Sequence, residues 1–211
     1  MSDFKLSQML EKHVKDKRIV AAMKLVPRHI FVPEDSKRFS YEDTALNIGH
    51  NQTTSQPSLI AMMLSELSVR SRDTVLEIGS GSGYVCAILS NLCSEVIGVE
   101  RIPELLAESR TKIAKLGITN ISLNLAEKRI GLRQKKPFDA IIVSAALPRI
   151  PFDLLDQLSP LGRLVCPVGD LNEQSIILLQ KHTARYTVKS LVGCKFVPFI
   201  GESGWSQEEI G

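Results

Sequence analysis

The segment from Val75 to Tyr84, with the sequence VLEIGSGSGY, constrains the fold of this chain more than any other. An apolar run interrupted only by Glu77 leads into three closely spaced glycines, and a helical pattern over 84–92 follows. Glycines at the point where a strand gives way to a helix let the backbone turn sharply and approach a ligand closely. The segment therefore predicts a strand, a ligand-binding turn and a helix at the carboxyl edge of a parallel sheet.

Strand and helix patterns alternate around and after this segment, which indicates an α/β protein. The strand patterns are apolar on both faces, as is typical of parallel strands covered by helices on two sides. We therefore expect a doubly wound, mainly parallel, Rossmann-like sheet that ends in an antiparallel strand pair. The predicted strands are 74–78, 95–99, 121–125, 138–143 and 163–167, then the pair 175–180 and 187–196, and the predicted helices are 84–92, 103–116 and 151–158.

The chain before this core has a different pattern. Helical spacing predicts short helices over 4–15 and 16–23, and a further helix over 58–67. The stretch 27–57 is predicted to be a long irregular loop, and such loops in compact domains are commonly functional. We expect a single domain over 1–211, with N-terminal helices and an active-site loop in 1–70, a cofactor-binding core in 71–170, and C-terminal strands and a tail in 171–211.

Composition argues against several classes of protein. The chain has 26 basic and 23 acidic residues, a net charge of +3, and only 5% aromatic residues, so neither a nucleic-acid surface nor a base-stacking platform is indicated. No apolar run approaches the ~18 residues of a membrane span, and the N-terminal stretch lacks the apolar region of a signal peptide. The cysteines and histidines are too dispersed for a metal site. We expect a cytoplasmic monomer without metal, nucleic-acid or membrane partners.

Acidic residues accompany the glycine loop. Glu100 ends the next predicted strand, where a doubly wound sheet places an acid that binds ribose hydroxyls, although a solvated strand-end acid is the alternative. Glu77 lies within an apolar strand and needs a partner, because an unpaired buried charge is costly. The glycine spacing is GxGxG rather than the GxGxxG of pyrophosphate binding, and no GxxxxGK[ST] loop is present. This pattern favours a nucleoside ligand without phosphate, for which S-adenosylmethionine is the common cellular example.

Several segments resemble the protein-L-isoaspartate (D-aspartate) O-methyltransferase family. The segment 49–57, GHNQTTSQP, is similar to the G-x-G-Q-T-I-S-Q-P signature, which is the family-specific part. The glycine loop, which many methyltransferases share, matches V-L-E-I-G-[ST]-G-S-G-Y, and 99–101 matches V-E-R. Further matches follow one another in order along the chain, at 26–33 (VPRHIFVP), 137–143 (PFDAIIV), 162–165 (GRLV), 167–169 (PVG) and 196–198 (FVP).

The resemblance implies a class I methyltransferase that uses S-adenosylmethionine to methylate the α-carboxylate of L-isoaspartyl residues in damaged proteins and peptides. The ester then collapses to a succinimide, and hydrolysis of the succinimide returns some normal aspartate. A carboxylate is already ionised at pH 7, so this reaction needs alignment and exclusion of water rather than a strong base. The lack of a conspicuous acid–base constellation in the sequence is consistent with that chemistry.

The resemblance also implies roles for individual residues. Ser55 would donate a hydrogen bond to the substrate carboxylate, although a serine here also suits a helix N-cap. Thr53 and Thr54 would complete the catalytic group. The substrate side would include Arg28, Val197 and Pro198, and the alternative for Arg28 is an exposed surface cation. The cofactor would be bound by Glu77, Gly79, Ser80, Gly81, Gly83, Glu100, Arg101 and Glu127.

Three positions depart from the family pattern. Asn51 replaces a glycine, and asparagine is the least costly substitute where a positive φ is required. Thr54 replaces an isoleucine. The sequence Ala126-Glu127-Lys128 replaces G-D-G, whose aspartate is expected to meet the adenine amino group, so Glu127 keeps the charge with one more methylene.

The last departure leaves open a second class of function. A protein of the same fold that binds S-adenosylmethionine or an isoaspartyl peptide with weak or no turnover is one alternative. A methyltransferase for a different carboxylate is another, and the segment 52–57 argues against it. A dinucleotide oxidoreductase is disfavoured by the glycine spacing.

Overall fold

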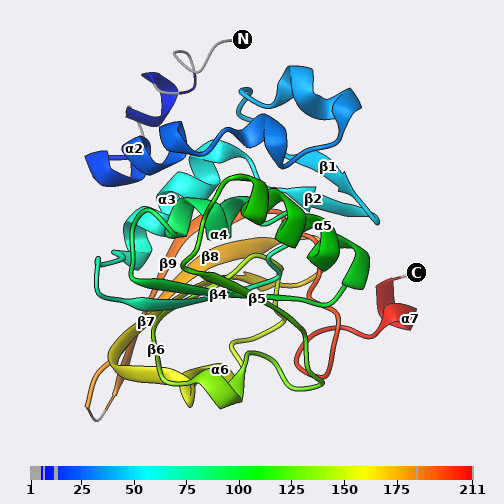
Figure 1. Cartoon of the computed structure of the whole chain (residues 1–211). Helices are drawn as coiled ribbons and strands as arrows, with labels where there is room; N and C mark the ends of the chain where they lie inside the picture. The colour runs from blue at the N-terminus through cyan, green and yellow to red at the C-terminus, as the bar shows by residue number, and fades with distance from the viewer. Residues whose placement is uncertain (1–5, 7, 12–13, 184, 211) are drawn as a thin grey trace.

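A seven-stranded sheet forms the centre of the computed structural model, which describes residues 6, 8–11, 14–183 and 185–210 (Figure 1). The strand order is β5-β4-β3-β6-β7-β8-β9, in which the first five strands are parallel and the last two are antiparallel. The predicted doubly wound sheet with a terminal antiparallel pair is therefore confirmed. The strands are β3 Thr74–Ile78, β4 Glu95–Glu100, β5 Ile121–Leu125, β6 Phe138–Val143, β7 Leu158–Gly169, β8 Gln174–Lys181 and β9 Tyr186–Cys194.

Helices cover both faces of the sheet, because successive side chains of each buried strand enter opposite apolar cores. In β3, Val75 packs into the core beneath α2 to α5, whereas Leu76 and Ile78 pack into the core that α6 covers. Figure 1 shows α3, α4 and α5 above the sheet and α6 below it. The helices are α2 Lys17–Leu25, α3 Pro57–Leu67, α4 Tyr84–Leu89, α5 Pro103–Lys115, α6 Phe152–Leu155 and α7 Gln207–Ile210.

The stretch 27–57 is more regular than the sequence predicts. It contains a hairpin of β1 Leu46–Gly49 and β2 Gln52–Thr54, preceded by two 3-10 helices, Arg28–Ile30 and Glu34–Phe39. The hairpin has only short strands, so the alternation of its apolar residues is too brief to detect in the sequence. Its turn places Asn51 at a φ of 56°, which is the positive φ that asparagine accepts in place of glycine.

Other predicted boundaries shift by a few residues. The helix predicted over 84–92 ends at Leu89, and the helix predicted over 151–158 contains only Phe152–Leu155. The helix α6 is short because the next strand, β7, already begins at Leu158. This strand extends beyond both ends of the predicted strand 163–167. The predicted helix over 4–15 includes residues outside the described part of the chain, and residues 6 and 8–11 within it are helical.

The order in which the strands are added to the sheet reverses between β3 and β6, which are parallel neighbours. It runs outward from β3 to β4 and β5, then returns to place β6 on the other side of β3. Ligands bind at such a switch point, beyond the carboxyl ends of the strands. The segment after β9 reaches the same place, since the Ala146 N–H donates to the Val197 carbonyl (2.8 Å) and the Phe199 N–H donates to the Ala146 carbonyl (2.7 Å).

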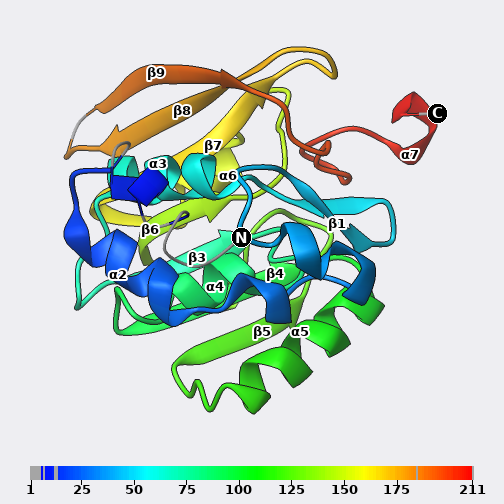
Figure 2. The same ribbon diagram turned by 90° about the horizontal axis from the view of Figure 1, so that it is seen from above.

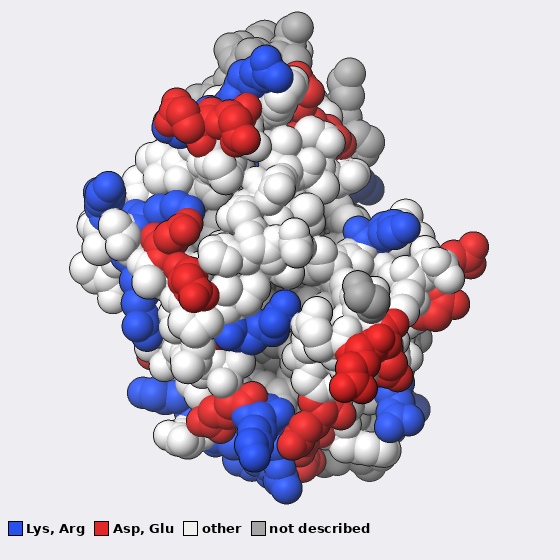
Figure 3. All heavy atoms as spheres, turned by 90° about the vertical axis from the view of Figure 1, so that its right-hand side faces the viewer, with Lys and Arg blue, Asp and Glu red and all other residues white. Residues whose placement is uncertain are grey.

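The two edges of the sheet are different. Figure 2 shows β5 beside α5 at one edge and β9 at the other. On the side of the molecule shown in Figure 3, basic and acidic side chains are interspersed, and no single sign dominates that face. Within the described part of the chain, none of the helices combines the length and apolar character that crossing a lipid bilayer requires.

Candidate active site

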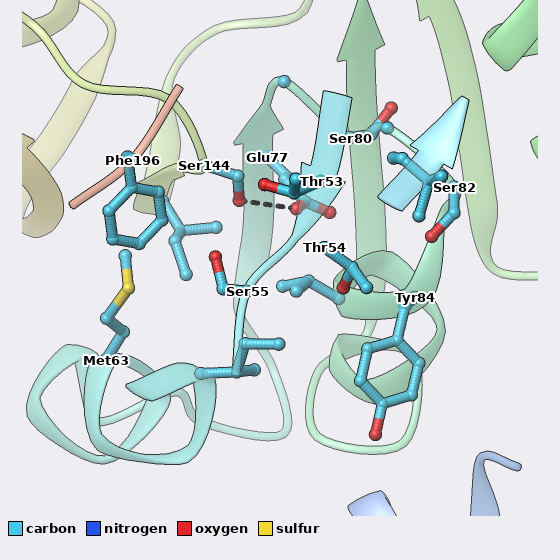
Figure 4. Close-up of a pocket in the computed structure, with 16 residues that line it drawn as sticks. Thr53, Thr54, Ser55, Met63, Glu77, Ser80, Ser82, Tyr84, Ser144 and Phe196 are labelled. Atoms are coloured by element: carbon cyan, nitrogen blue, oxygen red, sulfur yellow. Dashed lines mark hydrogen bonds between the residues drawn. The ribbon is translucent and has the colours of Figure 1, made fainter. Parts of the chain in front are cut away.

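Two adjoining pockets lie at the carboxyl edge of the sheet. The inner pocket is lined by residues of β2, the segment after it, α3, the glycine loop and Phe196 (Figure 4). The outer pocket is lined by the other side of the glycine loop, the ends of β4 and β5, and the segment 197–201. Ile48, Thr53, Gly79, Gly81 and Ser144 line both pockets, so the two pockets adjoin one another at these residues.

The glycine loop is held tightly against the end of β4. The N–H groups of Gly79 and Ser80 both donate to the Val99 carbonyl, at 2.8 and 3.1 Å. Gly81 has a φ of +50°, and a Cβ at this position would lie 3.0 Å from the Ile48 side chain of the hairpin. The predicted requirement for glycine is therefore confirmed at this position by both the backbone conformation and the close approach of β1.

Glu100 is a buried organiser of this loop rather than a solvated acid. Its Oε2 accepts a hydrogen bond from the Gly81 N–H (2.8 Å), and its Oε1 accepts one from the Ile102 N–H (2.9 Å). The residue is only 5% exposed and lines the outer pocket. Each carboxylate oxygen can accept a second hydrogen bond, so Glu100 can hold the loop and a ligand hydroxyl at the same time.

Glu77 has the hydrogen-bond partners that its burial requires, and both partners are neutral side chains. The Cys86 thiol donates to Oε2 and the Ser144 hydroxyl donates to Oε1, both at 2.8 Å (Figure 4 shows the second bond). Burial raises the pKa of Glu77 to about 7, the two hydrogen bonds oppose this rise, and the nearby Glu100 adds to it. Burial likewise raises the pKa of Cys86 well above its ordinary value, so the thiol remains a donor.

The pKa of Glu77 leads to a testable pH dependence of stability. Because the pKa rises from 4.5 to about 7 on folding, the unfolded chain releases this proton at lower pH than the folded protein does. We expect the wild type to lose about 3 kcal/mol of unfolding free energy relative to Glu77→Gln as pH rises through this window, with no further relative loss above it. Urea unfolding of both proteins between about pH 4 and about pH 8 measures this difference, and parallel profiles would contradict it.

Ser55 points into the inner pocket from the segment between β2 and α3. Figure 4 shows its side chain between Met63 and Phe196 on one side and Thr54 on the other. Among the described residues, its hydroxyl has no hydrogen-bond partner. The alternative role as an N-cap is wrong, because α3 begins after Gln56 and the Ser58 N–H is bound by an Asp43 carboxylate oxygen (2.9 Å). The N-cap function is thus supplied from the preceding loop, which leaves the Ser55 hydroxyl available.

The two neighbouring threonines occupy different positions. Thr54 is buried in the wall of the inner pocket, whereas Thr53 is exposed and lines both pockets. Val197 and Pro198 line the outer pocket. The Val197 carbonyl already accepts a hydrogen bond from the Ala146 N–H. In this pair of residues, the main-chain groups left for a substrate backbone are the Val197 N–H and the Pro198 carbonyl.

Arg28 requires a correction. It lines neither pocket, and its side chain is fully buried rather than being an exposed cation. The guanidinium donates to the carbonyls of Ser40 (3.1 Å), Glu42 (3.3 Å), Thr44 (2.9 Å) and Ser55 (3.0 Å). Burial lowers its pKa. Arg28 therefore fixes the main chain that carries Ser55 and does not reach a substrate in the pocket.

The departure at 126–128 lies at the mouth of the outer pocket. Ala126, Glu127 and Lys128 line it together with Glu100 and Arg101. Glu127 is exposed, and its carboxylate accepts a hydrogen bond from the Gln134 amide (3.1 Å). The position predicted to meet the cofactor thus still presents a carboxylate at the pocket.

Several lining residues of the inner pocket were not predicted. Ser144 follows the carboxyl end of β6, which is the strand next to β3 across the switch point. Its place directly after a predicted strand is the signal that could have identified it. Tyr84, Met63 and Phe196 supply the large side chains of the same pocket, and their sequence context resembles ordinary core.

A doubly wound sheet, a glycine loop at its switch point and a buried acid at the end of the neighbouring strand form a site for a nucleoside-containing ligand, and solved methyltransferases of class I share this fold. The family follows from comparison with known proteins. Residues 3–204 match the family model described as Protein-L-isoaspartate(D-aspartate) O-methyltransferase (PCMT), and the chain belongs to this family.

Relatives in sequence and structure agree with this assignment. The chain is 44% identical over 201 residues to a protein-L-isoaspartate O-methyltransferase of Methanoculleus marisnigri, covering 95% of this chain and 91% of the relative. It is 42% identical over 204 residues to that of Geobacter metallireducens, covering 96% and 94%.

Solved structures extend the comparison to three dimensions. A protein-L-isoaspartate O-methyltransferase structure superposes with a TM-score of 0.86 at 26% identity, covering 96% of this chain and 67% of that one. A Plasmodium falciparum structure described as the same type of enzyme, in complex with S-adenosyl-L-homocysteine, superposes with a TM-score of 0.79 at 25% identity, covering 92% and 95%.

Proposed function

We propose that this chain is a protein repair enzyme that transfers the methyl group of S-adenosylmethionine to the α-carboxylate of L-isoaspartyl residues in damaged proteins and peptides. The observation that carries the proposal is that residues 53–55 of the family-specific segment and the glycine loop line the same inner pocket. A substrate carboxylate at Ser55 and a methyl donor on the glycine loop would meet in that enclosure. The main-chain nitrogen that follows then attacks the ester carbonyl and displaces methanol, and hydrolysis of the resulting succinimide converts part of the damaged residues to normal aspartate.

The residues of the pockets suit this cofactor. Ser80 lines the inner pocket, and its buried hydroxyl has no hydrogen-bond partner among the described residues. We propose that the loop residues Gly79, Ser80, Gly81 and Gly83 hold the amino-acid portion, that Glu100 holds the ribose, and that Arg101 and Glu127 flank the base. Glu77 would support the cofactor site indirectly, because it accepts hydrogen bonds from Ser144 and Cys86 below the glycine loop. When bound, S-adenosylmethionine supplies an activated methyl group on a sulfonium centre.

The protein's own part in the reaction is positioning. The substrate carboxylate is ionised at neutral pH and is itself the nucleophile, so no residue has to remove a proton. We propose that the Ser55 hydroxyl donates a hydrogen bond to one carboxylate oxygen and turns the other toward the methyl group, with Thr53 and Thr54 shaping the same wall. Met63 and Phe196 on the opposite side would exclude water, which competes for the carboxylate.

We propose a division of labour along the chain. Residues 71–170 would hold the cofactor, and 1–70 with 171–211 would supply the substrate side. We further propose that the protein acts as a cytoplasmic monomer, without nucleic-acid or membrane partners. The mixed charge of the face in Figure 3 supports the lack of a nucleic-acid surface on that side, and the four free cysteines support a reducing compartment.

Transfer of label from S-adenosylmethionine to an isoaspartyl peptide tests the function. We expect the label to enter the peptide as a base-labile methyl ester, and the peptide to return partly to the aspartyl form after repeated cycles. Cofactor binding without any ester would favour the binding protein that the sequence at 126–128 suggests. Esters on other carboxylic acids, with none on the isoaspartyl peptide, would favour the second alternative.

Glu100→Gln tests the cofactor site independently of turnover. Glutamine keeps the size of the side chain, but it loses the charge and turns an N–H₂ group toward the Gly81 or Ile102 N–H. We expect the Kd for S-adenosylhomocysteine, measured by calorimetry, to rise about tenfold or more. Glu95→Gln, at the exposed start of the same strand, is the matched control and should bind as the wild type does. Equal affinities for the two variants would exclude Glu100 from the site.

A further inference from the structure

A groove lies between α3 and β9, outside the two pockets of the proposed active site. One wall is the exposed side of α3, from Gln56 to Glu66, and the other is the stretch 189–195. Its floor includes Leu59, Met62 and Leu191, which pack on the core but are only partly buried. Among the described residues, Lys189 of β9 and Glu66 of α3 form a side-chain ion pair across the groove, at 3.5 Å.

The β9 strand gives this groove an unpaired main-chain edge. The sheet ends at β9, whose only partner within the described structure is β8 (Figure 2). The strand is largely exposed, with Val188 61% and Val192 47% accessible. An exposed strand edge beside apolar side chains is the surface onto which an extended polypeptide adds as a further strand.

The groove adjoins the inner pocket along two elements, because residues next to one another in the sequence line the two sites. Along α3, Leu59 and Met62 face the groove, whereas Ile60 and Met63 line the inner pocket. After β9, residues 194–195 line the groove and the next residue, Phe196, lines the inner pocket. Gln56 at the end of the groove also follows Ser55 directly. The end of the groove near Gln56 and Lys195 is therefore the part nearest to the inner pocket.

We propose that the α3–β9 groove holds the segment of the substrate polypeptide next to the isoaspartyl residue, extended along β9. The proposal rests on the proposed function and adds to it a second site of contact with the substrate. Main-chain pairing is independent of sequence, which suits an enzyme that acts on damage in many proteins. Lys195 is exposed in the groove wall and forms no ion pair with another described residue, so the groove favours segments with acidic side chains.

Peptide length and two surface variants test the proposal. The substrates are an isoaspartyl tripeptide and longer peptides that extend it by about six residues on either side, with glutamate or lysine in the extension. For the wild type we expect at least one glutamate-containing long peptide to have a KM about tenfold below that of the tripeptide. We expect Val192→Glu, which places a like charge in the groove wall against the glutamate extension, to abolish this advantage while kcat and the tripeptide KM stay unchanged.

Matched variants separate the groove from general effects of charge. Val188→Glu lies on the same exposed strand but outside the groove, and it should retain the advantage of the long peptide. Lys195→Glu should reverse the preference between glutamate and lysine extensions. Equal KM values for short and long peptides in the wild type, or identical behaviour of the Val192 and Val188 variants, would overturn the proposal. Failure of the proposed function itself is distinguishable, because the wild type would then not methylate even the tripeptide.

Discussion

Replacing Ser55 by alanine is expected to lower kcat for an isoaspartyl peptide about hundredfold, with little change in the affinity for S-adenosylhomocysteine. The side chain lines the inner pocket, its hydroxyl has no partner among the described residues, and it does not cap α3. Its loss should therefore remove a group that orients the substrate carboxylate and leave the helix and the glycine loop intact. Single-turnover kinetics with saturating cofactor, together with calorimetry of S-adenosylhomocysteine binding, separate the two effects.

Ser65→Ala is the matched control for this prediction. Ser65 lies on α3, two residues beyond Met63, and lines neither pocket. We expect wild-type kcat from this variant. A Ser55→Ala enzyme with wild-type kcat would remove Ser55 from the mechanism, and a simultaneous loss of cofactor binding would indicate a structural role instead.

Arg28→Met is expected to cause the largest loss of stability, about 4 kcal/mol of unfolding free energy. The variant retains much of the apolar volume, but four carbonyl groups of the loop lose their charged donor in a buried place. Because one of these carbonyls belongs to Ser55, the remaining folded enzyme should also have a lowered kcat. Urea unfolding measures the first effect, and turnover per folded molecule measures the second.

Two other substitutions calibrate the role of Arg28. Arg28→Lys keeps the charge, but the lysine ammonium has fewer donors than the guanidinium and lacks its planar geometry. We therefore expect an intermediate loss of unfolding free energy. Lys37→Met, on the exposed 3-10 helix of the same loop, removes only a surface ion pair and should cost less than about 1 kcal/mol. A loss for Arg28→Met no greater than that of Lys37→Met would show that the carbonyl cluster does not stabilise the loop.

The sequence predicts well the features that local pattern determines. The strand, glycine loop and helix around residues 74–89 depend on apolar runs and on backbone conformations that only a few residues accept. The placement of Glu100 beside the loop follows from the geometry of parallel strands, because their carboxyl ends meet at one edge. The requirement for a positive φ at Asn51 is likewise local, and the structure confirms it.

Features that depend on contacts distant in the sequence could not be predicted. In the sequence Arg28 resembles a surface cation, because the main-chain carbonyls that accept its hydrogen bonds lie 12 to 27 residues further along the chain. The capping of α3 by Asp43, 15 residues before Ser58, left Ser55 free in a way that the local sequence does not indicate. The neutral partners of Glu77 come from α4 and from the end of β6, and nothing in β3 specifies them.

The central claim is that this chain methylates isoaspartyl and not aspartyl residues. The most direct measurement places two peptides of one sequence, differing only in that linkage and distinguished by an isotope, in one reaction with S-adenosylmethionine. Mass spectrometry at short times should find the methyl ester on the isoaspartyl peptide alone. Esterification of both peptides at similar rates, or of neither while S-adenosylmethionine is bound, would contradict the account.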